Sequence, residues 1–241
     1  MLCAKKNTHN QRHSKRTKMT RYVFSLWVLI SPLTLLSQTI ALDASTLEPI
    51  HVSMRPETWG QRQVVRVVKD PAIKEVDEPT FVNIRGSDFT NGTLEVYVLS
   101  RLLPTAPEVA RGFIGIAFRI APDRSRFECI YLRPTNGRAE DQLRRNRATQ
   151  YFSFPDFKFD RLRRESPGQY ESYADMGLNE WIKIKIDVTG RQARLYVNDS
   201  PQPVLVVNDL KHGDQARGSI GLWVDVGTEG FFSDLKITHT P

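Results

Sequence analysis

The sequence predicts an all-β fold, a two-sheet antiparallel sandwich of the jelly-roll type. Short runs rich in β-branched and aromatic residues recur along residues 42–241, and each is closed by Gly, Pro, Asn or Asp. The turn signals recur about every ten residues, which is typical of sandwiches and barrels rather than of alternating strands and helices. Residues 42–241 are also long enough to bury one sizeable core. We therefore expect a single β-sandwich domain over this range.

Strands are expected wherever such a run is long enough to alternate between two faces. The best helical candidate, residues 139–149, is rich in arginine and has no apolar stripe, so we expect a loop or a single turn there. Residues 134–177 are expected to form a long, packed and functional loop, because they keep several aromatic side chains. The expected strands are residues 64–68, 81–85, 93–99, 112–120, 127–133, 181–188, 192–197, 204–207, 219–224 and 230–238.

An uncharged segment from Tyr22 to Ala41 follows a basic segment that has no acidic residue. A basic stretch, an apolar stretch and small residues at its end predict a secretory signal peptide over residues 1–41, cut before Leu42. Met19 opens a conventional leader by itself, so translation could begin there. A retained signal anchor is the alternative, since the run barely reaches the length of about 20 residues that spans a bilayer. Cleavage implies an exported protein, either periplasmic or extracellular.

The excess positive charge of the chain lies in this predicted leader. The sequence has 34 Lys and Arg against 27 Asp and Glu, a net charge of +7, and seven of the basic residues fall within residues 1–41. The mature domain is therefore neutral, which argues against a nucleic-acid or anionic-membrane partner. Cys3 leaves with the leader and Cys129 stands alone, so we expect neither a disulfide nor a cysteine metal site.

Alternation along three strands predicts a shallow groove. In GFIGIAFR, FECIYLR and SIGLWVD the aliphatic and bulky residues occupy alternate positions and are expected in the core. Small residues then form the floor of the opposite face, which is expected to carry Arg119, Tyr131, Arg133 and Trp223. Aromatic rings stack on sugar rings, and guanidinium groups bond hydroxyls or carboxylates. This composition favours a sugar-binding surface.

A polar segment after the second of these strands is expected to form the rim of the groove. It contains Asn136, Arg138, Gln150 and Tyr151, with further amides and arginines between them. Planar amides and guanidinium forks suit sugar hydroxyls, and several arginines together suit an acidic sugar. A solvated charged loop with internal ion pairs is the alternative. The three arginines that follow are expected to be plain surface: Arg161, Arg163 and Arg164.

Four segments carry a family resemblance: GFIGIAFR, FECIYLRPTNGR, LNEWIKIKIDVTGRQARLYVND and GSIGLWVDVGTEGFFSDLKI. Over roughly residues 80–240 the chain resembles the concanavalin A-like lectin/glucanase superfamily. The most similar members are LamG-like domains and the family-16-like 3-keto-disaccharide hydrolase domains of bacterial exported proteins. The resemblance implies a jelly roll with a convex and a concave sheet, and a ligand site on the concave side. The positions that match that face are Arg119, Tyr131, Arg133 and Trp223.

Catalysis has a weaker signature than binding. Glucanases of that superfamily carry a strand with the pattern Glu-x-Asp-x-(x)-Glu, which this sequence lacks. Glycoside hydrolysis needs two carboxylates about 5 to 10 Å apart, and the nearest acidic positions are isolated along the chain: Glu128, Asp187, Asp225 and Glu229. A hydrolase or lyase acting on di- or oligosaccharides is therefore second to glycan binding, and a structural or protein-interaction module is third. No cofactor or metal site is expected, because no Asp- and Asn-dense loop marks a calcium site.

Overall fold

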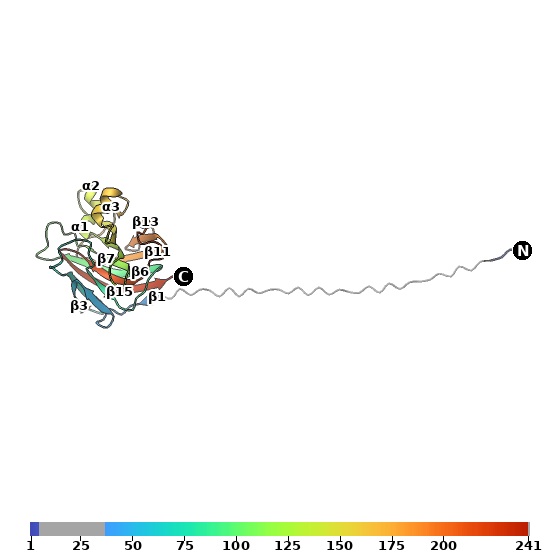
Figure 1. Cartoon of the computed structure of the whole chain (residues 1–241), viewed down its shortest axis with the longest axis horizontal. Coiled ribbons are helices and arrows are strands. Elements are labelled where there is room, and N and C mark those ends of the chain that lie inside the picture. Colours follow the sequence, from blue (N-terminus) through green and yellow to red (C-terminus); the bar gives the residue numbers. More distant parts are fainter. Residues whose placement is uncertain (5–36, 241) are drawn as a thin grey trace. The chain divides into compact units, whose positions relative to one another are not determined.

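Two antiparallel sheets form the domain in the computed structural model, which describes residues 1–4 and 37–240 (Figure 1). One sheet has eight strands in the order β13-β12-β11-β6-β15-β4-β3, with β1 paired to β15. The other has seven strands in the order β10-β9-β8-β7-β14-β5-β2. Strands adjacent in space pair antiparallel, as β6 does with β15 and β7 with β8. This arrangement confirms the predicted jelly-roll sandwich.

All ten expected strands are present, with ends that differ by a few residues. The eight-stranded sheet consists of β1 (Ser37–Thr39), β3 (Val52–Trp59), β4 (Arg62–Lys69), β6 (Gly92–Leu102), β11 (Ile182–Thr189), β12 (Gln192–Val197), β13 (Leu205–Val207) and β15 (Thr228–His239). The seven-stranded sheet consists of β2 (Leu47–Ile50), β5 (Phe81–Ile84), β7 (Ile114–Ile120), β8 (Phe127–Leu132), β9 (Thr149–Phe154), β10 (Glu171–Ser172) and β14 (Ser219–Val224).

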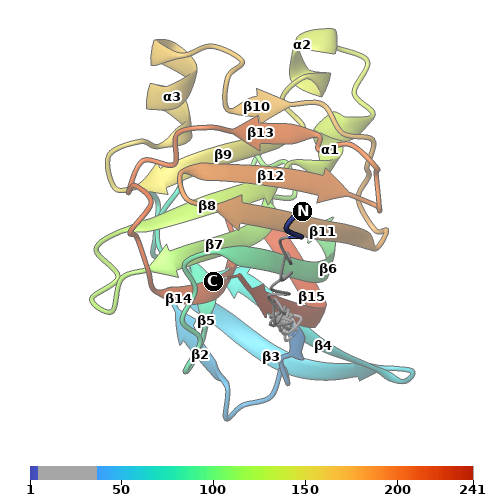
Figure 2. The same cartoon turned by 90° about the vertical axis from the view of Figure 1, so that its right-hand side faces the viewer.

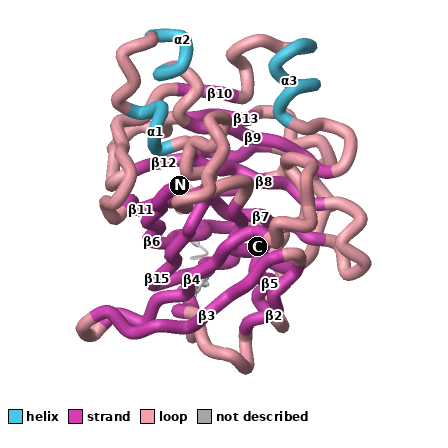
Figure 3. Tube along the Cα trace, turned by 90° about the vertical axis from the view of Figure 1, so that its left-hand side faces the viewer, coloured by secondary structure: helices cyan, strands magenta, loops and turns pink. Residues whose placement is uncertain are grey.

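Three short helices lie at the end of the sandwich that carries β10, away from β2 and β3 (Figures 2 and 3). They are α1 (Pro134–Gly137), α2 (Gln142–Arg145) and α3 (Phe159–Glu165). The single turn expected within residues 139–149 is α2. All three helices interrupt the connections around β9 and β10, so they gather over one end of the seven-stranded sheet.

The core between the sheets follows the alternation expected for strands. Along β6 and β11, buried residues alternate with half-buried ones, and the buried set points toward the seven-stranded sheet. The aliphatic residues expected in the core of β7 and β14 are fully buried as well. The central members of this core are Leu94, Val96, Val98, Ile114, Ile116, Ile182, Ile184, Ile186, Ile220 and Leu222.

The seven-stranded sheet is buried on both faces, because a third layer covers part of its outer face. Every residue of β7 and β8 is buried. The covering segment is residues 70–80, between β4 and β5. The indole Nε1 of Trp223 donates to the carbonyl oxygen of Glu78 at 2.9 Å, and Oγ1 of Thr80 donates to that of Val224 at 2.6 Å. Nζ of Lys158, just before α3, donates to the carbonyl oxygen of Val76 at 3.1 Å.

Residues 134–177 are packed, as expected, but they do not form one long loop. They contain the three helices together with β9 and β10. The sequence of β9, TQYFSF, shows no apolar alternation because both of its faces are buried. The polar residues Thr149, Gln150 and Ser153 interrupt its apolar run, so the sequence did not predict this strand, although it predicted the equally buried β7 and β8.

The predicted leader lies mostly outside the described residues. Its residues Ser37–Thr39 form β1, which pairs with β15 and is exposed along its length. Cleavage before Leu42 would therefore remove one exposed edge strand. Among the described residues, no helix combines the length and apolar character needed to cross a membrane. The signal peptide, its cleavage site and the alternative anchor stay predictions.

Candidate functional site

A cavity of about 550 Å³ opens on the outer face of the seven-stranded sheet, where residues 70–80 leave it uncovered. Its walls come from the segment before β7, the ends of β8 and β14, the covering segment and the helices α1, α2 and α3. Antiparallel pairing places these strand ends side by side, so residues far apart in the sequence meet. The charged residues in its lining are Arg111, Arg133, Arg144, Arg147, Arg163, Asp77, Asp141 and Asp225.

Two buried aspartates, Asp77 and Asp225, form one side of the cavity. The backbone N–H of Asp77 donates to Oδ2 of Asp225 at 3.0 Å, and Nζ of Lys69 contacts Oδ1 of Asp225 at 2.5 Å. Oδ2 of Asp77 accepts from the backbone N–H of Phe159 at 2.7 Å. The φ of Asp77 is 54°, in the left-handed region that costs a residue other than glycine some energy. The surrounding hydrogen bonds hold this conformation.

Burial raises the pKa of Asp77 to about 7. The negative charge of Asp225 adds to this effect, whereas the N–H of Phe159 and the charges of Arg133 and Lys158 oppose it. Near neutral pH the cavity therefore holds one carboxyl group that exchanges its proton next to another that is paired with Lys69.

Arg133 holds another part of the cavity wall together. Its guanidinium donates to Oη of Tyr131 at 2.7 Å, to Oε1 of Gln150 at 3.1 Å and to Oε1 of Glu171 at 3.1 Å. Burial opposes ionisation of Glu171, but hydrogen bonds from Arg163 and the charge of Arg133 hold the pKa of its carboxyl below the ordinary value. Arg133 is thus a buried, strongly bonded part of the wall.

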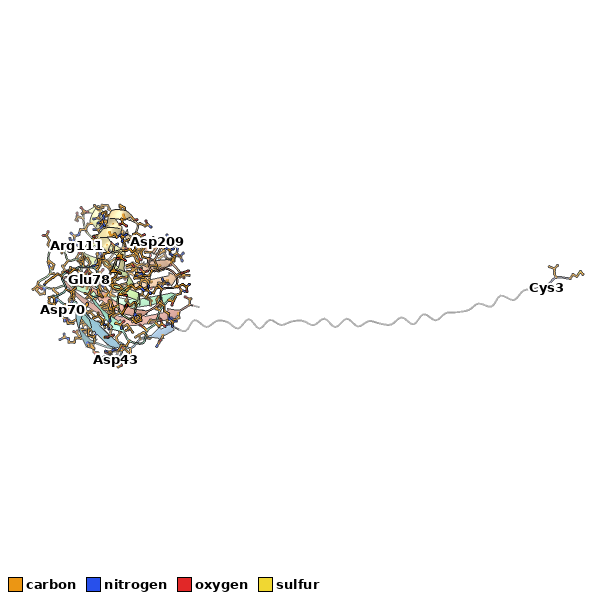
Figure 4. All side chains as sticks on the ribbon, in the orientation of Figure 1. Cys3, Asp43, Asp70, Glu78, Arg111 and Asp209 are labelled. Atoms are coloured by element: carbon orange, nitrogen blue, oxygen red, sulfur yellow. The ribbon has the colours of Figure 1, made fainter. Side chains whose placement is uncertain are left out.

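The mouth of the cavity is both basic and apolar. Arg111 and Arg144 lie there, and the exposed aliphatic side chains at the mouth are Val76, Val109 and Leu143. The rings of Phe113 and Phe159 are half-buried within the lining. Figure 4 labels Arg111 and Glu78, the latter from the covering segment that borders the opening. A ligand that enters would meet two aromatic rings and several guanidinium groups.

Trp223 and Tyr131 face the predicted side of the sheet, but neither is exposed. Both belong to an aromatic cluster with Phe152, in which the ring centroids of Tyr131 and Trp223 are 4.8 Å apart. Residues 70–80 cover this cluster. The expected open stacking surface is therefore wrong for Trp223, because alternation determines the face of a side chain and not what lies over that face. Tyr131 does contribute to the cavity lining.

Arg119 does not reach the outer face, so its expected place in the groove is wrong. Its φ of 53° breaks the alternation near the end of β7, beside an irregularity in the pairing of β7 with β14. The buried guanidinium instead donates to the carbonyl oxygens of Thr90, Gly190 and Gly213 at 2.7 to 3.0 Å. These carbonyls lie in loops next to β6, β12 and β14, so Arg119 ties loops together at the edge of the core.

The four expected rim residues have different environments. Tyr151 lies between the sheets, where its Oη donates to Oε2 of Glu128 at 2.6 Å, so its expected place on a rim is wrong. Gln150 is buried beside Arg133, and Asn136 lines the cavity, where its Oδ1 accepts from Nε of Arg144 at 3.0 Å.

Arg138 is the exposed member of the expected rim. It forms salt bridges with Asp175 at 2.8 Å and Glu180 at 3.0 Å, and it does not line the cavity. For Arg138 the alternative of a solvated loop with internal ion pairs is the better description. A binding role for Tyr131, Arg133 and Asn136 stays a prediction.

Several lining residues were not singled out by the sequence analysis. Arg163, expected to be plain surface, lines the cavity from α3. Phe113 precedes β7 on the outer-face register, so the alternation that selected Tyr131 would also have selected it. Asp77 and Phe159 lie in segments without periodicity, and nothing in the sequence connects them to each other or to Asp225.

Of the four acidic residues considered for catalysis, only Asp225 lines the cavity. Asp187 and Glu229 lie on the eight-stranded sheet, each in a salt bridge with a basic side chain. Glu128 is buried between the sheets. Asp225 shares the cavity with Asp77, whose backbone N–H it accepts from, and with Asp141.

The sequence matches no protein-family model and no curated protein. Among solved structures, the carbohydrate binding module CBM66 from Bacillus subtilis is 13% identical, with 78% of this chain and 96% of that chain covered and a TM-score of 0.50. A β-glucanase from Bacillus licheniformis is 10% identical over 86% of this chain and 94% of that chain, with a TM-score of 0.43. Domain 4 of AbnA, a GH43 extracellular arabinanase from Geobacillus stearothermophilus, is 12% identical over 78% and 75%, with a TM-score of 0.42. At these identities the similarity is one of fold alone, and for the carbohydrate binding module it agrees with the two-sheet β-sandwich described above.

Proposed function

We propose that this domain binds a carbohydrate in the cavity on the outer face of its seven-stranded sheet. The observation that carries the proposal is the combination of two half-buried rings, Phe113 and Phe159, with guanidinium and carboxyl groups in one open cavity. Sugars present apolar ring faces and hydroxyl edges, so a site with both aromatic and polar groups matches them.

The fold supports this proposal. The solved structure with a TM-score of 0.50 is a carbohydrate binding module, and this chain covers 96% of it. A closer relation to LamG-like or 3-keto-disaccharide hydrolase domains is part of the proposal, as is action outside the cytoplasm after removal of residues 1–41. Extracellular glycans would then be the available ligands.

A glycan array followed by calorimetry tests the proposal. Phe113→Leu removes a stacking ring while keeping apolar bulk, so affinity for the bound oligosaccharide should fall by about 1–3 kcal/mol. Tyr173→Leu is the matched control, because Tyr173 is exposed and lies outside the cavity lining. Absence of any glycan ligand, or equal losses in the two variants, would mean that the cavity is not a sugar site.

A hydrolase acting in the same cavity is the second candidate, and Asp77 is the observation that favours it. A carboxyl group with a pKa of about 7 in a cavity suits a general acid. Asp225 supplies a second carboxyl group in the same lining. Because Lys69 and two backbone N–H groups already occupy the oxygens of Asp225, binding without turnover remains the preferred function.

Turnover can be separated from binding with one variant. Oligosaccharides that bind in calorimetry would be incubated with the protein, and released reducing ends would be measured. If Asp77 is a general acid, Asp77→Asn should abolish release while keeping the complex. No release by the wild-type protein would reject the hydrolase and leave the binding function in place.

A further inference from the structure

Arg111 and Arg144, at the mouth of the cavity, differ from the other lining arginines in their salt-bridge partners. Arg133, Arg147 and Arg163 all form salt bridges with Glu171. Among the residues that the structure describes, neither Arg111 nor Arg144 has a salt-bridge partner. Among the described residues, the cavity therefore contains two guanidinium groups that no carboxylate contacts directly, although the charge of Glu108 acts on Arg111.

Neutral oxygens position both side chains. Nη1 of Arg111 donates to the carbonyl oxygens of Glu108 at 2.5 Å and Ala110 at 2.8 Å. Nε of Arg144 donates to Oδ1 of Asn136 at 3.0 Å. These bonds use one nitrogen of Arg111 and leave others for a ligand, while they restrict the positions of the guanidinium groups. A held guanidinium loses less conformational freedom when it binds an anion.

The two positive charges also disfavour each other. Burial lowers the pKa of Arg111, and the charges of Arg144 and Arg133 lower it further. The nearby carboxyl groups offset this repulsion only in part: the charge of Glu108 raises the pKa of Arg111, Oδ1 of Asp141 accepts from the backbone N–H of Arg144 at 2.6 Å, and Asp225 is paired with Lys69. An anion between the guanidinium groups would relieve this repulsion.

We propose that Arg111 and Arg144 form a seat for the anionic group of an acidic sugar, a uronate carboxylate or a sulfate ester. This inference rests on the proposed carbohydrate-binding function and names the class of sugar. The carboxylate presents two oxygens and the sulfate ester three, in a geometry that guanidinium groups bind with paired hydrogen bonds. The sugar ring would then extend from the mouth toward Phe113 and Phe159, which line the same cavity.

The first experiment tests the seat without a sugar. Sodium sulfate would be titrated into the labelled protein at constant ionic strength, and the arginine Nε–H resonances would be followed by NMR. Saturable shifts are expected at Arg111 and Arg144, and chloride should not reproduce them. Two results would overturn the seat. One is shifts that rise linearly with sulfate concentration and do not saturate. The other is saturable shifts at other arginines that persist in the Arg111→Gln/Arg144→Gln variant.

The second experiment uses a pair of ligands that differ in charge. Trigalacturonate and its methyl ester share their ring hydroxyls, and a sulfated galactose oligosaccharide forms the third arm. The acid or the sulfated sugar should bind at least about tenfold more tightly than the ester, since charge-assisted pairs are the stronger ones. The preference should disappear in the Arg111→Gln/Arg144→Gln variant. It should persist in the control Arg138→Gln/Arg164→Gln, which removes the same charge outside the cavity.

The outcomes separate this inference from the proposed function. Equal binding of the acid and the ester would overturn the anion seat and leave carbohydrate binding intact. Saturable sulfate binding at both arginines with no sugar bound would support the seat and count against the carbohydrate. A preference for the acid that persists in the Arg111→Gln/Arg144→Gln variant would show that other residues recognise the charge, and it would overturn the seat.

Discussion

Two regions of one sheet face differ in what lies over them. Around Trp223, residues 70–80 cover an aromatic cluster, and the face is as buried as a core. Around Phe113, a few strand positions away, the same face opens into a cavity lined by arginines and aspartates. Both regions carry outward-facing aromatic side chains, so the residue pattern of the strands does not distinguish them. What distinguishes the two regions is the covering segment, residues 70–80 between β4 and β5, which lies over one region and leaves the other open.

The difference assigns opposite roles to similar side chains. An aromatic ring under the covering segment stabilises the fold, whereas a half-buried ring beside the opening is available to a ligand. Mutation of a covered ring should therefore mainly lower the free energy of unfolding. Mutation of the ring beside the opening should mainly lower the affinity for a ligand.

The largest expected effect is on stability at the covered region. Trp223→Ala deletes a fully buried ring and the donor to the Glu78 carbonyl, so the free energy of unfolding should fall by about 3–5 kcal/mol. Phe113→Leu should cost less than about 1.5 kcal/mol, since apolar volume is largely kept. Urea unfolding of both variants measures the contrast. Similar losses in the two would erase the distinction between the regions.

A pH-dependent effect of similar size is expected where the two regions meet, at Asp77. Its pKa is about 7 in the fold against an ordinary 3.8, so the folded protein keeps this proton while the unfolded chain releases it. Stability from this group is therefore full below about pH 4 and is lost as the pH rises toward 7. Each pKa unit corresponds to about 1.4 kcal/mol.

Asp77→Asn should flatten the dependence of unfolding free energy on pH between 4 and 7, measured by urea unfolding across that range. The groups that face Asp77 are Asp225, Arg133 and Lys158, and all three remain in the variant. Asp156→Asn, at an exposed position, is the control. An unchanged slope in Asp77→Asn would mean that Asp77 is ionised in the fold.

The smallest effect is expected at Arg138, on the exposed loop beside the opening. Its ion pairs with Asp175 and Glu180 are solvated, and such pairs contribute little to stability. Arg138→Ala should leave both the unfolding midpoint and sugar affinity nearly unchanged. A loss of affinity as large as that of Phe113→Leu would extend the binding surface beyond the cavity.

The sequence predicted the fold more fully than the site, for a physical reason. Runs of β-branched and aromatic residues that alternate between two faces, such as 182–189, predicted ten strands, and all ten exist. The faces of Tyr131 and Trp223 followed from the same alternation. Three features had no local signal: the buried strand β9, the covering segment, and the positive φ that turns Arg119 inward. The site depends on all three, because each decides which side chains reach the cavity.

A complex with an oligosaccharide chosen from the glycan array gives the most direct test of the central claim. Its crystal structure should show a sugar in the cavity, with a ring against Phe113 or Phe159 and an anionic group between Arg111 and Arg144. A sugar bound on the outer face of the eight-stranded sheet, for example at the aromatic pair Trp59 and Trp181, with the cavity left as it is here, would contradict the account.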